Sequence, residues 1–140
     1  MSKVEIRIVI CFFLIILCYQ QVLSQVDSNF TEQILFENGK EDYACYRIPA
    51  ILQLRNGKIL SFVEGRVNGC NDFGNIDILM KHSDDGGLNW SKQKIIVDNK
   101  SLQVGNPAPV VDHHDPLFPS GRIFLFFNTG TQSEQEIRNG

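Results

Sequence analysis

Short apolar runs separated by turn-forming residues dominate the chain after residue 32. The runs occupy residues 33–36, 48–54, 58–63, 76–81, 94–97, 109–111 and 122–127. Some alternate apolar with polar positions and others are continuously apolar, which is the pattern of β-strands that are buried on one face or on both. We therefore predict an all-β fold without a helix. The periodicity alone leaves a sandwich, a barrel and a propeller open as architectures.

Turn-forming residues mark the breaks between these runs. The breaks contain Asn38-Gly39, Asn56-Gly57, Asp85-Gly86-Gly87 and Ser120-Gly121. Asn, Asp and Gly accept the positive backbone angles of tight hairpin turns. The clearest case is Asn56-Gly57, which predicts an antiparallel hairpin between its flanking strands. The last segment, residues 129–140, is polar and poor in strand-forming residues.

The N-terminal segment has the pattern of a secretory signal peptide over residues 1–24. Lys3 and Arg7 precede an apolar stretch at residues 8–19, and compact residues, Val22 and Ser24, stand at the −3 and −1 positions of a cut after Ser24. The apolar stretch is shorter than the roughly 20 residues that span a bilayer, so a retained anchor is the less favoured alternative. We expect residues 25–140 to enter the secretory pathway, with secretion, the lysosome or the cell surface as destinations.

Charge and composition narrow the range of ligands. The 140 residues carry a net charge of −3 and are 43% hydrophobic, which is typical of a globular chain. Lys and Arg do not cluster, so we do not expect a nucleic-acid partner, although a locally basic pocket would accept a small anion. His82, His113 and His114 lack the spacing of a metal site. We expect no metal and no other cofactor.

Two features fit an oxidising compartment. Cys45 and Cys70 are the pair that remains after signal removal, which favours a disulfide over two free thiols. Asn29, Asn89 and Asn99 each begin an Asn-x-Ser/Thr sequence and are predicted N-glycosylation sites.

Residues 83–90, with the sequence SDDGGLNW, match the SxDxGxxW pattern called the Asp box. Ser83 and Asp85 are suited to accept hydrogen bonds from backbone donors of a turn, Gly87 permits its geometry, and Trp90 packs back on the hairpin. We interpret this motif as structural, with no chemistry for Asp84 or Asp85. The motif recurs in β-propellers, once per blade.

Three further motifs resemble parts of sialidases. Residues 46–49 (YRIP) resemble the opening of sialidase catalytic domains, residues 62–66 (FVEGR) resemble the following F-x-E/D-x-R strand end, and residues 105–112 with 121–127 are similar to the next strand pair. The resemblance extends from about residue 43 to residue 136. It implies about the first two blades of a six-bladed β-propeller and a glycoside hydrolase that releases terminal sialic acid from glycoproteins, glycolipids or oligosaccharides. The alternative is a non-catalytic propeller that binds glycans or proteins.

The resemblance also implies roles for five residues. Arg47 would be one of three arginines that bind the substrate carboxylate, for which the planar guanidinium is a geometric match. Arg66 would contact ring substituents near O4, and Asn106 would be a further sugar contact. Asp72, six positions after Arg66, would be the general acid and base. Glu134 would reach the glycerol chain of the sugar.

Other parts of the mechanism are expected elsewhere. Asp77 competes with Asp72 for the acid role, but its place in a strand predicts a side chain fixed on one face. The resemblance implies a tyrosine nucleophile, its Glu partner and two more arginines beyond Gly140, because six blades need about 240 to 290 residues. We therefore expect this chain alone to be inactive. Membrane contact is expected only through a glycolipid substrate or an uncleaved signal segment.

Positions of the cysteines relative to these residues give a geometric prediction. Cys45 precedes Arg47 by two residues, and Cys70 precedes Asp72 by two residues. If Arg47 and Asp72 converge on one sugar, the two cysteines must also lie close together. We predict that their Cα atoms lie within about 7 Å, which is the limit for a disulfide.

Overall fold

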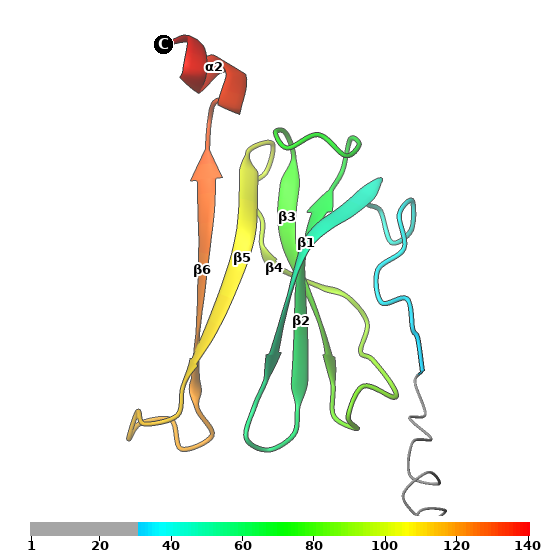
Figure 1. The fold of residues 1–140 in the computed structure, drawn as a ribbon, viewed down its shortest axis with the longest axis vertical. Helices are drawn as coiled ribbons and strands as arrows, with labels where there is room; N and C mark the ends of the chain where they lie inside the picture. The colour runs from blue at the N-terminus through cyan, green and yellow to red at the C-terminus, as the bar shows by residue number, and fades with distance from the viewer. Residues whose placement is uncertain (1–30) are drawn as a thin grey trace, which may run out of the picture. The chain divides into compact units, whose positions relative to one another are not determined.

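The computed structural model describes residues 31–140, and it contains a six-stranded sheet and one short helix (Figure 1). The elements are β1 (Cys45–Gln53), β2 (Ile59–Arg66), β3 (Ile76–Ser83), β4 (Lys94–Val97), β5 (Gln103–Asp112), β6 (Arg122–Gly130) and α2 (Glu134–Asn139). The all-β prediction is confirmed. The predicted signal segment and the glycosylation site Asn29 lie outside the described residues.

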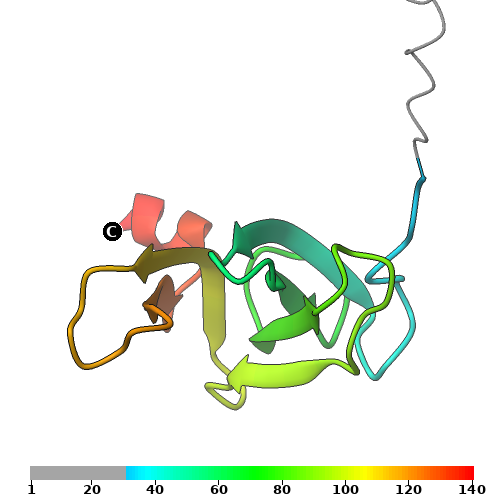
Figure 2. The same cartoon turned by 90° about the horizontal axis from the view of Figure 1, so that it is seen from below.

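The sheet consists of a four-stranded antiparallel group followed by a hairpin. β1 pairs with β2, β2 with β3 and β3 with β4, each antiparallel. β5 and β6 form an antiparallel pair that joins the group through one parallel bridge, between Ile76 and Gln103. Viewed from below, this hairpin lies beside the four-stranded group (Figure 2). The bridge brings the start of β5 to the end of the sheet where β2 finishes and β3 begins.

The turn between β1 and β2 has the geometry that its sequence predicts. The backbone N–H of Leu54 donates to the carbonyl of Lys58 at 2.8 Å, and Gln53 pairs with Ile59 across the hairpin. Gly57 has φ 86°, a conformation that glycine adopts at no steric cost. The Asn56-Gly57 hairpin is therefore confirmed.

Residues 83–90 form a turn whose side chains bind its own backbone. Ser83 Oγ accepts from the N–H of Gly87 at 2.9 Å, and Asp85 Oδ1 accepts from the N–H of Asn89 at 2.9 Å. The indole N–H of Trp90 donates to the carbonyl of Gly87 at 3.0 Å. The bonds from the backbone and side chain of Asn89, with a smaller contribution from Ser83, lower the pKa of Asp85 to about 2. These contacts support a structural role for Asp85.

The core lies on both faces of β2 and β3. Leu60, Phe62, Ile78 and Val104 form one buried cluster, and a second contains Val63. Side chains alternate between the faces of a strand, so Phe62 and Val63 necessarily belong to opposite faces. Burial on both faces explains why the run in β2 is apolar with little alternation.

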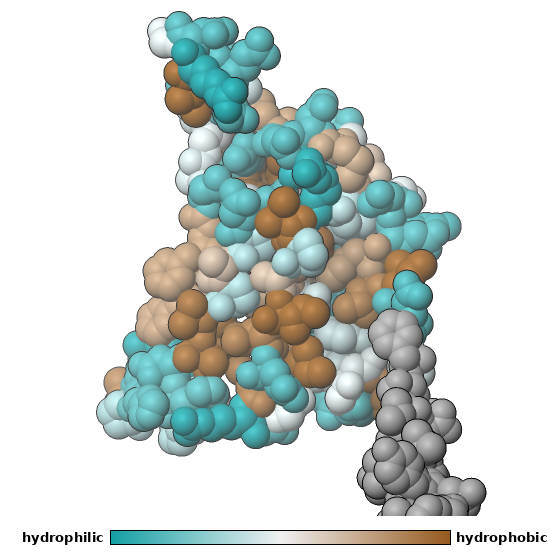
Figure 3. Space-filling model, in the orientation of Figure 1, coloured by the Kyte–Doolittle hydropathy of each residue, from teal (hydrophilic) through white to brown (hydrophobic). Residues whose placement is uncertain are grey.

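Large apolar side chains remain exposed on the β5–β6 hairpin. Phe126 is 60% exposed and Val110 is 52% exposed. Hydrophobic surface is visible over the lower half of the face shown in Figure 3. Because Phe126 and Phe127 are adjacent and both exposed, β6 presents apolar side chains on both of its faces.

Two predictions about the elements are wrong. Residues 33–36 do not form a strand; Phe36 instead packs its ring against Tyr46, with centroids 5.4 Å apart. The predicted absence of a helix fails at α2, where Ser133 and Glu136 form a capping box. α2 buries no residue, so it has no apolar periodicity that sequence analysis could detect.

Within residues 31–140, the helical structure is neither long nor apolar enough to cross a membrane.

Candidate active site

A cavity of about 730 Å³ lies where the end of β2, the loop after it, β5 and α2 meet. Four predicted site residues line it: Arg66, Asp72, Asn106 and Glu134. Residues far apart in the sequence thus share one cavity because the bridge between β3 and β5 places their strands side by side. Glu64, a member of the FVEGR motif for which no role was predicted, also lines it.

Arg47 lies beside this cavity at the start of β1. The pairing of β1 with β2 is irregular between Arg47 and Ala50, and Ile48 in this bulge has φ 55°. Bulges re-aim side chains, and Pro49 has no N–H to donate to the ladder here. The side chain of Arg47 is 44% exposed, and its Nη1 donates to Asp72 Oδ1 at 2.7 Å.

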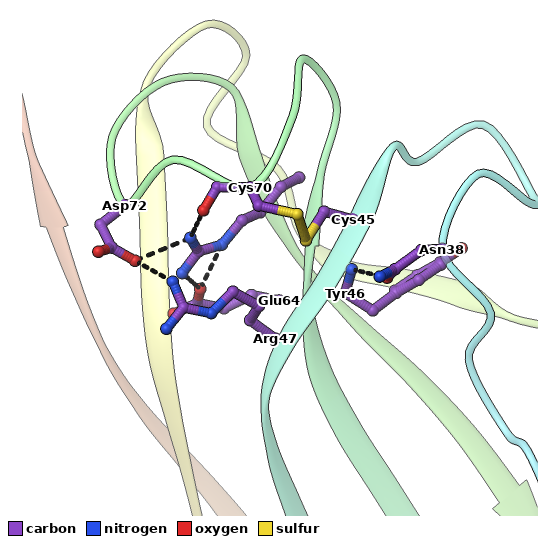
Figure 4. Close-up of a disulfide and its surroundings, with 8 residues drawn as sticks. Asn38, Cys45, Tyr46, Arg47, Glu64, Cys70 and Asp72 are labelled. Carbon is purple, nitrogen blue, oxygen red and sulfur yellow. Dashed lines mark hydrogen bonds and ion pairs between the residues drawn. A yellow bond between two sulfur atoms is a disulfide. The ribbon is translucent and has the colours of Figure 1, made fainter.

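Asp72 bridges two arginines from the loop between β2 and β3. Its Oδ1 accepts from Arg66 Nη1 at 2.8 Å as well as from Arg47, so two guanidinium groups converge on one carboxylate (Figure 4). The hydrogen bond and charge of Arg66, followed by the charge of Arg47, hold the pKa of Asp72 below its ordinary value. The side chain is 77% exposed. Asp72 is therefore an accessible carboxylate that is ionised at neutral pH in this structure.

The hydrogen bonds between Arg66 and Glu64 are buried. Its Nε and Nη2 donate to Glu64 Oε2 at 3.1 Å and 2.6 Å, and both side chains are only 4% exposed. Glu64 Oε1 accepts the backbone N–H of Asn106 at 2.8 Å, which links β2 to β5. A Cβ atom at residue 105 would lie 2.7 Å from Glu64 Oε1, so Gly105 is required for this close approach. Glu64 thereby fixes the direction in which Arg66 points.

Cys45 and Cys70 form a disulfide with their Cα atoms 5.3 Å apart, which agrees with the pairing predicted from the sequence (Figure 4). The carbonyl of Cys70 also accepts a hydrogen bond from Arg66 Nη1 at 2.6 Å. Two contacts therefore fix the loop just before Asp72, one to β1 and one to β2.

Asn106 and Glu134 complete the polar lining. Asn106 lies in an irregularity of the β5–β6 pairing between Gly105 and Ala108, has φ 53° and is exposed. Glu134 lies in the first turn of α2 and forms an ion pair with Arg138, one helical turn later. Both face the same cavity as Asp72.

No protein-family model matches the chain. A sialidase of Micromonospora viridifaciens is 34% identical over 101 residues, which are 69% of this chain and 15% of that protein. An exo-alpha-sialidase of Aspergillus fumigatus is 33% identical over 95 residues, 64% of this chain and 22% of that protein. The chain is related to sialidases. A sialidase of Clostridium perfringens is 36% identical over 80 residues, and this sialidase-related chain spans only 15 to 22% of the length of these relatives.

Two titratable residues of this sialidase-related chain lie on the other face of the sheet. Asp77 Oδ2 accepts from the hydroxyl of Tyr43 at 2.6 Å, and both residues are buried. Burial, followed by the hydrogen bond and charge of Asp77, raises the pKa of Tyr43 well above its ordinary range, and burial also raises the pKa of Asp77. The alternation along β3 directs Asp77 away from Ile76, which lines the cavity.

At the two predicted glycosylation sites in the described part of the chain, the asparagine side chains form hydrogen bonds within the protein. Asn89 Nδ2, the atom to which a glycan would be attached, donates to Asp85 Oδ2 at 2.8 Å, and Asn99 Nδ2 donates to Thr129 Oγ1 at 2.9 Å. Glycosylation at Asn89 and Asn99 stays a prediction. No group of three His, Cys, Asp or Glu side chains within residues 31–140 is arranged to hold a metal ion.

Proposed function

We propose that this chain contributes to the active site of a glycoside hydrolase that releases terminal sialic acid from glycoproteins, glycolipids or oligosaccharides. The observation that carries the proposal is the contact of Arg47 with Asp72 at 2.7 Å beside the cavity, in a chain related to sialidases. A cation for the substrate carboxylate and an acid for its glycosidic oxygen thereby lie together. The cation suits a glycoside that is itself an anion, and the acid suits a glycoside with a poor leaving group.

Arg47 is the carboxylate-binding residue in this proposal. A guanidinium offers parallel N–H donors that match both oxygens of a carboxylate, and the side chain of Arg47 is exposed enough to meet a ligand. Arg66 and Asn106, which both line the cavity, contact ring substituents. Glu134, on α2, meets the glycerol chain.

Asp72 is the acid and base of the reaction. It gives a proton to the departing glycosidic oxygen and afterwards accepts one from the attacking water. Sialidases use a tyrosine nucleophile rather than a second carboxylate. Tyr43 is unsuited to that role because its hydroxyl is buried against Asp77 on the opposite face of the sheet.

The proposed architecture is a six-bladed β-propeller in which β1–β4 form one blade and β5–β6 begin the next. The four-stranded antiparallel group and the short bridge to the following hairpin support this assignment. We further propose that the protein follows the secretory pathway, where the disulfide between Cys45 and Cys70 would persist.

Arg47→Ala in the full-length protein tests the carboxylate-binding role. We expect kcat/KM for a fluorogenic sialoside to fall by about 10- to 100-fold, because a charge-assisted hydrogen bond contributes roughly 1.5 to 3 kcal/mol. Arg55→Ala is the matched control, since Arg55 is an exposed arginine in the hairpin turn at the other end of β2. A wild-type protein that binds sialosides without hydrolysing them would instead favour a non-catalytic glycan-binding propeller.

A further inference from the structure

In the described part of the chain, the charged side chains that contact one another at the cavity balance. Arg47 and Arg66 carry two positive charges, and Glu64 and Asp72 carry two negative charges in contact with them. Glu134, which lines the same cavity from α2, is paired with Arg138. A bound carboxylate would therefore add a negative charge to a group of side chains that is neutral within residues 31–140, and it gains the guanidinium of Arg47 only if Asp72 leaves it.

We propose that Asp72 competes with the ligand carboxylate for Arg47, so that substrate binding requires its displacement. This inference rests on the proposed function of Arg47. Asp72 Oδ1 accepts the hydrogen bond from Nη1 of Arg47. A ligand carboxylate that binds bidentately through the Nη1 and Nη2 edge of the guanidinium would need Nη1 as well. If both were bound to the same guanidinium, the carboxylates of Asp72 and the ligand would also repel each other.

Asp72, and not Glu64, is the protein carboxylate that the ligand displaces. Its side chain is 77% exposed, whereas that of Glu64 is 4% exposed and bonded to Arg66 through two nitrogens. Water compensates the loss of ion-pair contacts for an exposed carboxylate but not for a buried one. Ligand binding thus leaves the pair of Glu64 and Arg66 intact.

The loop around Asp72 permits a short movement and limits a long one. Gly69 and Gly74 flank its tip with φ 134° and 132°, conformations that glycine adopts readily. At the base of the loop, Cys70 is held by the disulfide to Cys45 and by the hydrogen bond from Arg66. Asp72 therefore leaves Arg47 but stays beside the cavity.

This exchange would also change the acidity of Asp72. The charges that face Asp72 are those of Arg47 on β1 and Arg66 on β2, with Glu64 behind Arg66 and Glu134 across the cavity. The hydrogen bond and charge of Arg66 are the larger cause of the lowered pKa of Asp72, and the charge of Arg47 adds to them. Once the ligand carboxylate neutralises Arg47, that second contribution is lost and the pKa of Asp72 rises. Substrate binding would thus make Asp72 a better proton donor for the reaction that follows.

Equilibrium binding to the full-length protein tests the competition. The probes are N-acetylneuraminic acid and its neutral methyl ester, each measured by calorimetry with wild-type protein and Asp72→Asn. We expect Asp72→Asn to bind the acid up to about fivefold more tightly than the wild type does. An exposed ion pair contributes up to about 1 kcal/mol of free energy, which corresponds to that factor. The affinity for the methyl ester should not change.

Asp84→Asn is the matched control, because Asp84 is 64% exposed and pairs with Lys58 at 3.0 Å near the opposite end of β2. It should bind both probes as the wild type does. Equal or weaker binding of the acid by Asp72→Asn, or equal gains for acid and ester, overturns the competition. If Arg47→Ala weakens acid binding in that case, the proposed function stands; if Arg47→Ala has no effect on acid binding, both proposals fail.

Discussion

Glu64 organises the candidate site although the proposed function gives it no contact with the substrate. It accepts two bonds from Arg66 and one from the backbone N–H of Asn106, and it needs the space that Gly105 provides. The FVEGR motif indicated Arg66 but gave no partner for Glu64. That partner depends on the approach of β5 to β2, which no local pattern of residues encodes.

Glu64→Gln should destabilise the fold strongly. Within residues 31–140, the substitution removes the only buried carboxylate that contacts Arg66 and leaves the exposed Asp72 as its remaining charged partner. Removing one partner of a buried pair costs about 3 to 5 kcal/mol. Urea denaturation followed by circular dichroism measures the loss. Glu134→Gln, at an exposed ion pair with Arg138, serves as the control and should cost less than about 1 kcal/mol. Equal stability of the two variants would contradict the structural role of Glu64.

The loop between β2 and β3 is the element on which the site depends most. It carries Asp72, and it is held by the disulfide between Cys45 and Cys70. The sequence predicted this pairing because both cysteines precede residues expected to share one substrate. In contrast, the tilted packing of Phe36 on Tyr46 and the polar helix α2 were missed, since an apolar run need not be a strand and a helix without a buried face has no apolar period.

Removing the disulfide should affect stability and catalysis separately. For Cys45→Ser with Cys70→Ser, we expect the free energy of unfolding to fall by roughly 3 kcal/mol, because the bridge closes a 25-residue separation. Under conditions where the variant is folded, kcat should fall more than KM rises, since the acid is less well positioned while Arg47 remains on β1. The opposite result, a raised KM with unchanged kcat, would contradict the positioning role of the loop.

The candidate site is assembled between the four-stranded group β1–β4 and the following hairpin β5–β6. Its strands were largely predictable from apolar runs and turn residues, but periodicity could not choose among all-β architectures. β5 and β6 leave Val110 and Phe126 exposed, and in the proposed propeller these side chains would lie at the contact with a neighbouring blade.

The dependence of the rate on the leaving group tests the proposed role of Asp72 as the acid of a sialic acid hydrolase. Asp72→Ala and wild-type full-length protein are compared on an activated aryl sialoside and on a sialyl-galactoside with a poor leaving group. General acid catalysis contributes about 10² to 10⁴, so kcat/KM for the sialyl-galactoside should fall by that factor and much less for the aryl sialoside. Equal losses on both substrates would contradict the assignment of Asp72 as the proton donor.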